Sequence, residues 1–400
     1  MKVVTPAYYK NFKCIAGDCT DTCCAGWDVD VDAQSYVYYK TVTGAFGERL
    51  KSVMVPSEDG ECTFTLKDNM RCPFLNDENL CDLIIALGED KLCETCDEFP
   101  RFINRYGSIK EIGIAPSCIT AGEIIFNYRD RLDFIIEDDG DDKVVINDID
   151  PLTFVMLNQA RELAYDIVSD RNFQVRDRAV LLMNYSYEIQ KRLDKERDEL
   201  IVNVIDKFSD EENRSGILKK CLKNYSFIQG EFSVTEEKLA DAERIRKDLI
   251  AFFDNFKGVE IINPDWNRRR DETLQYLNKS DIKNLISDID EFNRYMKDRE
   301  YEYEQLLIYY VYRYFLDAVY DYDSLLKAKN GVVGFIILFV MGLAKYKTSG
   351  SFSKADQIDI AHLYSRQFEH SYSNFEVYRE WFGSKRRYSY ASLLRILALL

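Results

Sequence analysis

A long aromatic stretch in the second half of the chain reads YEYEQLLIYYVYRYFLDAVYDYDSLL over residues 301–326. Apolar or aromatic side chains occupy nearly every face of a helix through this stretch, which is typical of a helix packed on several sides. A second apolar stretch, GVVGFIILFVMGLA, follows at 331–344. It is shorter than the about 20 residues that a bilayer span requires, so it predicts a buried core helix.

Helical patterns extend outward from these two stretches. Asp150 and Pro151 predict an N-cap and a first helical turn, and apolar residues at helical spacing follow them. The sequence Ser233-Val-Thr-Glu236 is a capping box ahead of another amphipathic stretch. With only 7 Pro and 18 Gly, long regular elements are favoured over many turns. We therefore predict an all-helical domain over residues 151–400.

The overall charge limits the classes of partner. Lysine and arginine number 53 against 69 aspartates and glutamates, which gives a net charge of -16. This acidic field repels phosphate backbones and anionic membranes and favours cationic partners. Residues 1–13 contain no apolar run of signal-peptide length. We expect a cytoplasmic chain with no nucleic-acid partner and no membrane anchor.

Cysteine is concentrated at the start of the chain. In a cytosolic chain, thiols crowded in this way indicate a metal site more often than disulfides. The two histidines, His362 and His370, lie far from these thiols in sequence, so the site would be mostly or wholly thiolate. An iron–sulfur cluster and structural zinc both remain open. The cysteines concerned are Cys14, Cys19, Cys23, Cys24, Cys62, Cys72, Cys81, Cys93, Cys96 and Cys118.

The spacing of the thiols allows more than one kind of site. A Cys-x2-Cys pair such as Cys93 and Cys96 places two sulfurs on one turn. The vicinal pair Cys23-Cys24 is expected to split its sulfurs between two directions. There are more thiols than one four-ligand site requires. The pattern therefore allows two sites, or one site with reactive or structural cysteines beside it.

An acidic segment separates the cysteines from the helices. The sequences Phe134-Ile-Ile136 and Val144-Val-Ile146 flank the carboxylates of 137–142, which predicts a small β-hairpin with a solvated tip. The sequence thus divides into a cysteine-rich metal-binding module at 1–128, a hairpin connection at 129–150 and the helical domain at 151–400.

Several motifs match one known family. They are Phe12-Lys-Cys14, Cys19-Thr-Asp-Thr-Cys23-Cys24-Ala-Gly-Trp27, Arg71-Cys72-Pro-Phe-Leu75, Leu80-Cys81, Leu92-Cys93-Glu-Thr-Cys96, Phe99-Pro100-Arg101 and, near the other end, Tyr364-Ser-Arg366-Gln-Phe-Glu369-His370-Ser371 with Asn374. Together they resemble the flagellin lysine-N-methylase family, whose front part is similar to the zinc- or iron-chelating cysteine-cluster proteins. The resemblance implies methyl transfer from S-adenosylmethionine to lysines of flagellin, in a family of which some members are thought to carry a four-iron cluster.

The resemblance also implies a set of metal ligands. Cys62 has no place in the pattern, so a plain buried thiol and a ligand are equally good interpretations of it. The positions shared with the wider group are Cys19, Cys23, Cys24, Cys72, Cys81 and Cys96, and those shared with the methylases alone are Cys14, Cys93 and Cys118.

Lysine methylation requires a deprotonated amine, because the free pKa of lysine is near 10.4. On a helix, Arg366 and His370 lie one turn apart, so His370 with Glu369 is a candidate base and Arg366 a candidate clamp for the donor carboxylate. Local pairing of these residues is the alternative. The sequence has no glycine-rich nucleotide fingerprint, and Gly26 stands where a radical-type Cys-x3-Cys-x2-Cys motif would need cysteine. The donor site therefore stays unplaced.

These observations predict a mainly α protein with an irregular N-terminal cysteine-rich metal-binding module, a small β-hairpin and an all-helical domain. The predicted function is S-adenosylmethionine-dependent methylation of lysines in flagellin or a similar protein. One alternative is a non-catalytic zinc- or iron-binding scaffold or interaction protein. Another is a metallochaperone or redox sensor that uses the spare cysteines.

Overall fold

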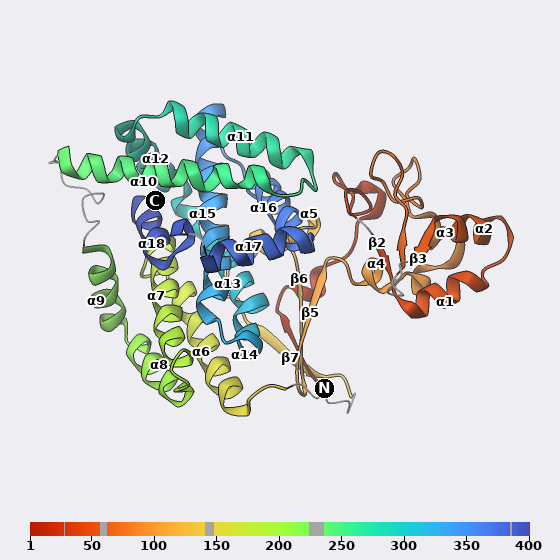
Figure 1. The fold of residues 1–400 in the computed structure, drawn as a ribbon, viewed down its shortest axis with the longest axis horizontal. Coiled ribbons are helices and arrows are strands. Elements are labelled where there is room, and N and C mark those ends of the chain that lie inside the picture. The colour runs from red at the N-terminus through yellow and green to blue at the C-terminus, as the bar shows by residue number, and fades with distance from the viewer. Residues whose placement is uncertain (28, 57–61, 141–147, 224–235, 385) are drawn as a thin grey trace.

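The computed structural model describes residues 1–27, 29–56, 62–140, 148–223, 236–384 and 386–400. Figure 1 shows a large helical body and, beside it, a smaller N-terminal part that we call the lobe, residues 29–98. Helices dominate the body, and the strands of the described residues are short and lie before residue 139. The prediction of a mainly α fold is confirmed.

The body is made of helices joined by short connections. Asp150 caps the first long helix as expected, since its side chain accepts a hydrogen bond from the Thr153 amide at 2.8 Å. The predicted capping box at 233–236 lies outside the described residues. The body helices are α5 (Ile119–Asn127), α6 (Pro151–Ser169), α7 (Val175–Leu193), α8 (Ile201–Ser209), α9 (Glu211–Leu222), α10 (Glu236–Asn255), α11 (Pro264–Lys279), α12 (Ile282–Met296), α13 (Glu300–Tyr314), α14 (Ala318–Asp321), α15 (Ser324–Ser349), α16 (Lys354–Glu369), α17 (Tyr372–Ser384) and α18 (Tyr390–Leu399).

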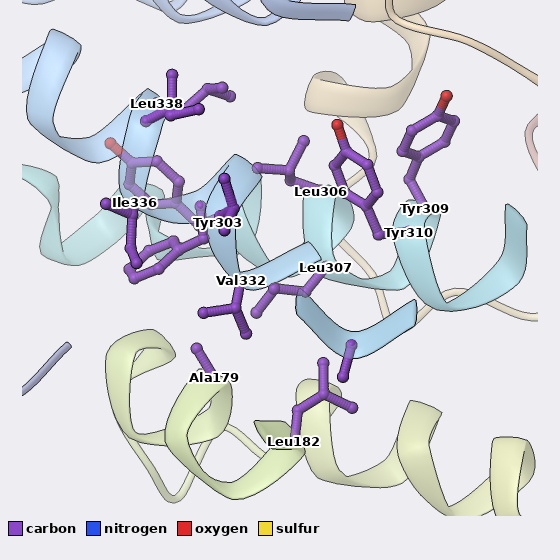
Figure 2. Packing of buried hydrophobic residues seen from close by; sticks show 14 of the residues in the cluster. Ala179, Leu182, Tyr303, Leu306, Leu307, Tyr309, Tyr310, Val332, Ile336 and Leu338 are labelled. Carbon is purple, nitrogen blue, oxygen red and sulfur yellow. The ribbon is translucent and has the colours of Figure 1, made fainter. Parts of the chain in front are cut away.

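The centre of the body is the contact of α7, α13 and α15, shown in Figure 2. Leu307 of α13 and Val332 of α15 lie between the helices and are fully buried. Gly334 allows α13 to approach closely, because a Cβ there would lie 2.9 Å from the Tyr310 ring. By length and composition α15 could cross a membrane, but 83% of its most apolar window is buried inside the protein. The prediction of a buried core helix at 331–344 is confirmed.

The aromatic stretch 301–326 is not one helix. α13 ends at Tyr314, a 3-10 turn and the short α14 follow, and α15 begins at Ser324. Tyr322 adopts a left-handed backbone (φ 55°), and the Asp323 side chain accepts from the Leu326 amide to cap α15. The hydrophobic pattern could not locate the end of α13, because Phe315, Leu316 and Val319 beyond it are buried and apolar as well.

A four-stranded sheet lies against the body. Its order is β5-β6-β1-β7, with β1 parallel to β6 and antiparallel to β7. The first half of the predicted acidic hairpin is strand β7, which pairs with the N-terminal strand. The second half, at 144–146, lies outside the described residues. The strands are β1 (Lys2–Pro6), β5 (Arg101–Tyr106), β6 (Ile109–Ile114) and β7 (Phe134–Asp138).

The lobe has a small core of its own. Tyr39, Phe64 and Phe74 are buried there, in a hydrophobic cluster separate from that of the body. By contrast, Ile114 of β6 and Ile125 of α5 belong to the cluster of the body. The lobe elements are β2 (Val29–Val31), α1 (Ala33–Thr41), α2 (Gly44–Val53), β3 (Met54–Pro56), β4 (Cys62–Phe64), α3 (Asp82–Leu87) and α4 (Glu94–Glu98).

A buried ion pair fastens the sheet to the body. Glu111 of β6 accepts two hydrogen bonds from Arg161 of α6, at 2.6 and 2.8 Å, and the two side chains are 1% and 6% exposed. Glu111→Ala leaves this arginine buried without its counter-ion, so we expect the free energy of unfolding to fall by about 3–5 kcal/mol. Urea denaturation measures the loss.

The control is Asp241→Ala, which breaks an exposed pair with Arg244 whose atoms lie 2.9 Å apart. Exposed pairs contribute about 0–1 kcal/mol, so this variant should unfold nearly as the wild type does. Equal losses in the two variants would contradict the importance of the buried pair.

Candidate functional site

The cysteine-rich loop at 14–27 lies where the lobe meets the body. Each of the chain's eleven cysteines is a free thiol. The helices of the body that face the lobe include α16 and α5 (Figure 1). The sequence predicted the crowding of these thiols, and the structure shows how each one is placed relative to the two parts.

On the lobe side, main-chain hydrogen bonds bring three cysteines together. The Cys72 amide donates to the Cys24 carbonyl at 2.8 Å, next to a β-bridge between Ala25 and Arg71. A second bridge joins Leu75 to Cys81. Cys96 packs against the same lobe core.

Neighbouring thiols shift one another's pKa values in this part of the lobe. Burial raises the pKa of Cys72 to about 12, and the neighbouring thiolates of Cys24 and Cys81 add to the effect. A hydrogen bond from the Cys23 thiol lowers the pKa of Cys24 to about 7, against the effect of burial and with help from the guanidinium groups of Arg71 and Arg366. Burial thus keeps the proton on Cys72, whereas the hydrogen bond and the nearby guanidinium groups favour the thiolate of Cys24.

Cys14 and Cys19 flank a 3-10 turn whose Gly17 lies against Glu78 and Leu80 of the lobe, whereas Cys118 packs on the core of the body. Cys118 is the N-cap residue of α5. Burial raises its pKa, and the charges of Cys19 and Cys14 raise it further. The Cys23 sulfur lies 4.0 Å from that of Cys24.

The remaining predicted ligand, Cys93, is fully buried in the lobe core together with Cys62. Cys93 is hydrogen bonded to Cys96 one turn away, which lowers the pKa of Cys93. Among the described residues, no three cysteine, histidine or carboxylate side chains converge closely enough to hold a metal ion as they stand. The donor set fits a thiophilic metal in its chemistry, and ligation by these cysteines stays a prediction.

Helix α16 holds the cysteine-rich loop at 14–27, which we call the thiol loop, against the body. Arg366 donates to the Asp21 carboxylate at 3.1 Å and to the Ala25 carbonyl at 2.5 Å. His362 is hydrogen bonded to the same carboxylate, with 2.7 Å between Nε2 and Oδ2. Burial alone would raise the pKa of Asp21, but the hydrogen bond to His362 and the charge of Arg366 outweigh it and keep the pKa below its usual value. Arg366 and His362 are both buried, and the Ala25 group that Arg366 binds belongs to the main chain. These contacts leave the loop little freedom.

Gly26 fits the loop to the body at one point. Its φ of +87° is in the left-handed region, and a Cβ on it would lie 2.8 Å from the Ile262 carbonyl oxygen. A side chain would therefore both strain the backbone and push the loop off the body.

His370 lies at the C-terminal end of α16, between two aromatic rings of the first hundred residues. Its ring centroid is 4.9 Å from that of Trp27 and 5.5 Å from that of Phe99. Burial lowers the pKa of His370 to about 3, with smaller contributions from Arg313 and Arg366. Its buried Nε2 has no hydrogen-bond partner within the part of the chain that the structure describes. The result is a neutral imidazole with a free nitrogen beside the thiol loop.

Glu369 points away into the body. It accepts from Tyr314 at 2.7 Å, from Tyr309 at 3.0 Å and from Ser365, and it pairs with Arg313 at 3.3 Å. Its carboxylate is already held by four donors. The structure thus brings His370 and Arg366 to the thiol loop and leaves Glu369 behind them, and a catalytic role for the three residues stays a prediction.

Sequence reasoning missed Asp21, His362 and the tyrosines around Glu369. Asp21 lies inside the Cys19–Cys23 spacing, where a carboxylate is an unusual neighbour for thiolates, and this was the available signal. His362 was one turn before Arg366 on the same helix face, but nothing in the sequence named its partner.

The fold and site define a helical protein whose C-terminal domain holds a thiol-rich N-terminal loop. A profile of the FliB lysine N-methylase C-terminal domain matches residues 161–396. This chain therefore belongs to the FliB lysine N-methylase family. No solved structure matches it.

Curated relatives resemble part of the chain. The flagellar biosynthetic protein FliU of Salmonella muenchen is 26% identical over 136 residues, which are 32% of this chain and 80% of FliU. The lysine-N-methylases of Salmonella choleraesuis and Salmonella typhimurium are each 26% identical over 145 residues, 32% of this chain and 34% of theirs. The match thus spans about a third of the length of these two methylases.

The contacts of Arg366 predict the local stability of the thiol loop. Arg366→Gln removes charge-assisted hydrogen bonds worth about 1.5–3 kcal/mol. We expect backbone amides of residues 19–27 to exchange with deuterium about 10 to 150 times faster, as measured by mass spectrometry of peptides. The matched control is Arg269→Gln, which breaks a 2.8 Å pair between α11 and Asp359 of α16 but leaves the loop alone. If Arg366→Gln leaves the deuterium exchange of the loop amides unchanged, Arg366 does not hold the loop.

The buried neutral His370 predicts a pH dependence. Below about pH 6.5 an unfolded histidine takes up a proton, whereas the folded one does not until about pH 3. The contribution of His370 to the free energy of unfolding is therefore fully present above pH 6.5, and below that pH it falls by up to about 1.4 kcal/mol per pH unit. His370→Phe keeps a ring between Trp27 and Phe99 but cannot titrate. Urea denaturation from pH 8 to 4.5 should give a shallower decline for the variant, and parallel curves would rule out the neutral imidazole.

Proposed function

We propose that this protein transfers methyl groups from S-adenosylmethionine to lysine side chains of flagellin or a similar flagellar protein, with a cysteine-bound metal centre. The observation that carries the proposal is the set of hydrogen bonds by which Arg366 and His362 of α16 hold the thiol loop. This helix lies within the segment that matches the lysine N-methylase domain. The family match supports lysine methylation, and these hydrogen bonds join the matched domain to the loop that carries the thiols.

The chemistry sets what the site must supply. The lysine nitrogen attacks the methyl carbon of the sulfonium, the new N–C bond forms as the C–S bond breaks, and a neutral thioether leaves. The amine must first lose its proton, through desolvation or to a base. A site walled by apolar rings favours the neutral amine, because burial disfavours the charged form.

His370 is placed to orient that amine. A pKa near 3 keeps the imidazole neutral but makes it a weak base, so we assign its free Nε2 to accepting an N–H of the lysine rather than to storing its proton. The rings of Trp27 and Phe99 beside it can attract a sulfonium or ammonium group by about 0.5–2 kcal/mol.

Arg366 and Glu369 act as positioning residues in this proposal. Arg366 holds the loop that carries Cys23, Cys24 and Trp27. Glu369 fixes the last turn of α16 through the tyrosines and Arg313, and so sets the place of His370.

The thiols suit an iron–sulfur cluster, with zinc as the alternative. The ligands that we propose are Cys14, Cys19, Cys23, Cys24, Cys72, Cys81, Cys93, Cys96 and Cys118. When bound, an iron with an open coordination position would supply a Lewis-acid hold on the amino and carboxylate groups of the donor. We place the reaction in the cytoplasm, where thiols stay reduced, and the net charge of -16 suits a lysine-bearing substrate.

A methylation assay tests the proposal. Protein purified without oxygen, incubated with flagellin and donor labelled in the methyl group, should place label on lysine. His370→Phe and Arg366→Gln should lower kcat by about 100-fold, since a displacement near 1 Å can cost that much, with the KM for flagellin changed less than threefold. Arg366→Lys should recover part of the rate.

The control is Arg269→Gln, which should react within twofold of the wild type. If metal-loaded wild type labels no lysine, and calorimetry finds no heat of donor binding, the methylase assignment fails. The non-catalytic metal-binding scaffold would then be the better interpretation.

A further inference from the structure

A cavity of about 720 Å³ lies between α10, α18 and the 3-10 turn Arg386–Tyr388, and we call it the arginine cavity. Figure 1 shows α18 and the start of α10 on the side of the body away from the lobe. The volume falls within the about 300–1,000 Å³ that small-molecule sites occupy. The charged residues that line the cavity are Arg244, Arg386, Arg387, Arg395, Asp241 and Asp248.

The lining of the arginine cavity carries an excess of positive charge. Four arginines against two aspartates leave a net charge of +2, in a chain whose net charge is -16. Arginine cannot relieve the excess by losing a proton, because its pKa lies above about 12. Guanidinium groups gathered around one cavity repel each other until an anion compensates them.

Two of the arginines have no carboxylate partner among the described residues. The Arg386 side chain is exposed, and in that part of the chain its guanidinium group has neither a hydrogen bond nor an ion pair. Arg387 donates to two uncharged oxygens, the side chain of Asn255 at 3.1 Å and the carbonyl of Ala251 at 3.5 Å. Both guanidinium groups can therefore bind an anion without first giving up a carboxylate.

The other two arginines hold the aspartates only weakly. Arg395 Nη2 lies 3.7 Å from the Asp248 carboxylate, which is longer than a hydrogen bond, and donates instead to the Ser392 hydroxyl at 3.0 Å. Arg244 pairs with Asp241 at 2.9 Å, but these side chains are 78% and 50% exposed, so water and salt screen the pair. An incoming anion can compete with either aspartate.

The turn that carries Arg386 and Arg387 is held in place by the body. The Ser392 hydroxyl donates to the Arg386 carbonyl at 2.8 Å. Tyr388 of the same turn is fully buried, with its ring centroid 5.1 Å from that of Phe252 on α10. A ligand therefore meets guanidinium groups on a fixed backbone, and ordering of this turn takes little from the binding free energy.

We propose that the arginine cavity binds a small ligand that carries two or more phosphate groups. A guanidinium group donates two parallel hydrogen bonds to a phosphate, and each phosphate concentrates up to two negative charges in a small volume. Four guanidinium groups from two helices and a turn match that density of charge. The inference goes beyond the proposed function, because the described lining residues lie outside the thiol loop and α16.

Isothermal titration calorimetry of the full-length chain with inorganic tripolyphosphate tests the proposal. In about 150 mM NaCl, where exposed charges are screened, the wild type should bind one tripolyphosphate per chain. Arg386→Gln and Arg395→Gln should each weaken binding by about 10 to 150 times, because each removes charge-assisted hydrogen bonds. Arg386→Lys should recover part of the affinity, since it keeps the charge but loses the paired donors.

Magnesium-free ATP distinguishes the sources of the phosphate groups. Tighter binding of ATP than of tripolyphosphate would show that the cavity takes a nucleotide, and equal binding would show that it takes the phosphate chain alone. Either result supports the proposal. Circular dichroism checks that each variant is folded. If Arg395→Gln does not fold, Arg386→Gln decides, because the Arg386 side chain is exposed.

The matched control is Arg268→Gln on α11, whose side chain pairs with Asp265 at 2.9 Å outside the cavity. It should bind tripolyphosphate as the wild type does. An equal loss in this control would show that only overall charge matters and would overturn the proposal. A wild type that gives no heat with tripolyphosphate would overturn it as well. Binding of a polyglutamate peptide but not of tripolyphosphate would replace it with a docking surface for an acidic protein.

Discussion

The guanidinium group of Arg366 connects the beginning of the chain to its end. It binds the Asp21 carboxylate and two main-chain carbonyls of the thiol loop, while His362 binds the same carboxylate from one turn earlier on α16. The lobe core and the body core are separate, so hydrophobic burial alone does not fix how they meet. Directional bonds at this junction do, and charge-assisted bonds in a buried setting are the strongest available for the purpose.

This junction also explains the state of the groups around it. His370 is neutral because burial between Trp27 and Phe99 opposes its charge, and nearby arginines oppose it further. Glu369 keeps its place because Arg313 and several hydroxyl donors satisfy it inside the body. An unpaired carboxylate at that depth would be costly. Among the described residues, two buried ring nitrogens of this region have no hydrogen-bond partner, the Nε2 of His370 and the Nδ1 of His362.

The thiols gain a physical interpretation from the same geometry. On the loop that Arg366 holds, the sulfurs of Cys23 and Cys24 lie 4.0 Å apart, and Gly26 then brings the backbone against Ile262. The lobe, which has a core of its own, presents this loop to the helical body. The junction is where two aromatic rings, a neutral imidazole and thiols meet.

The sequence by itself determined the helical class, the buried core helix at 331–344, the N-cap at Asp150 and the concentration of thiols before residue 119. These follow from local spacing, which is set by the period of a helix and by the chemistry of one residue type. It did not determine that β7 pairs with β1, or that the aromatic stretch breaks after Tyr314. Only the tertiary structure decided that Asp21 meets His362 and Arg366, about 340 residues away in the chain, because a contact between distant segments depends on the packing of everything between them. The division of the thiols between lobe and body depends on that same packing.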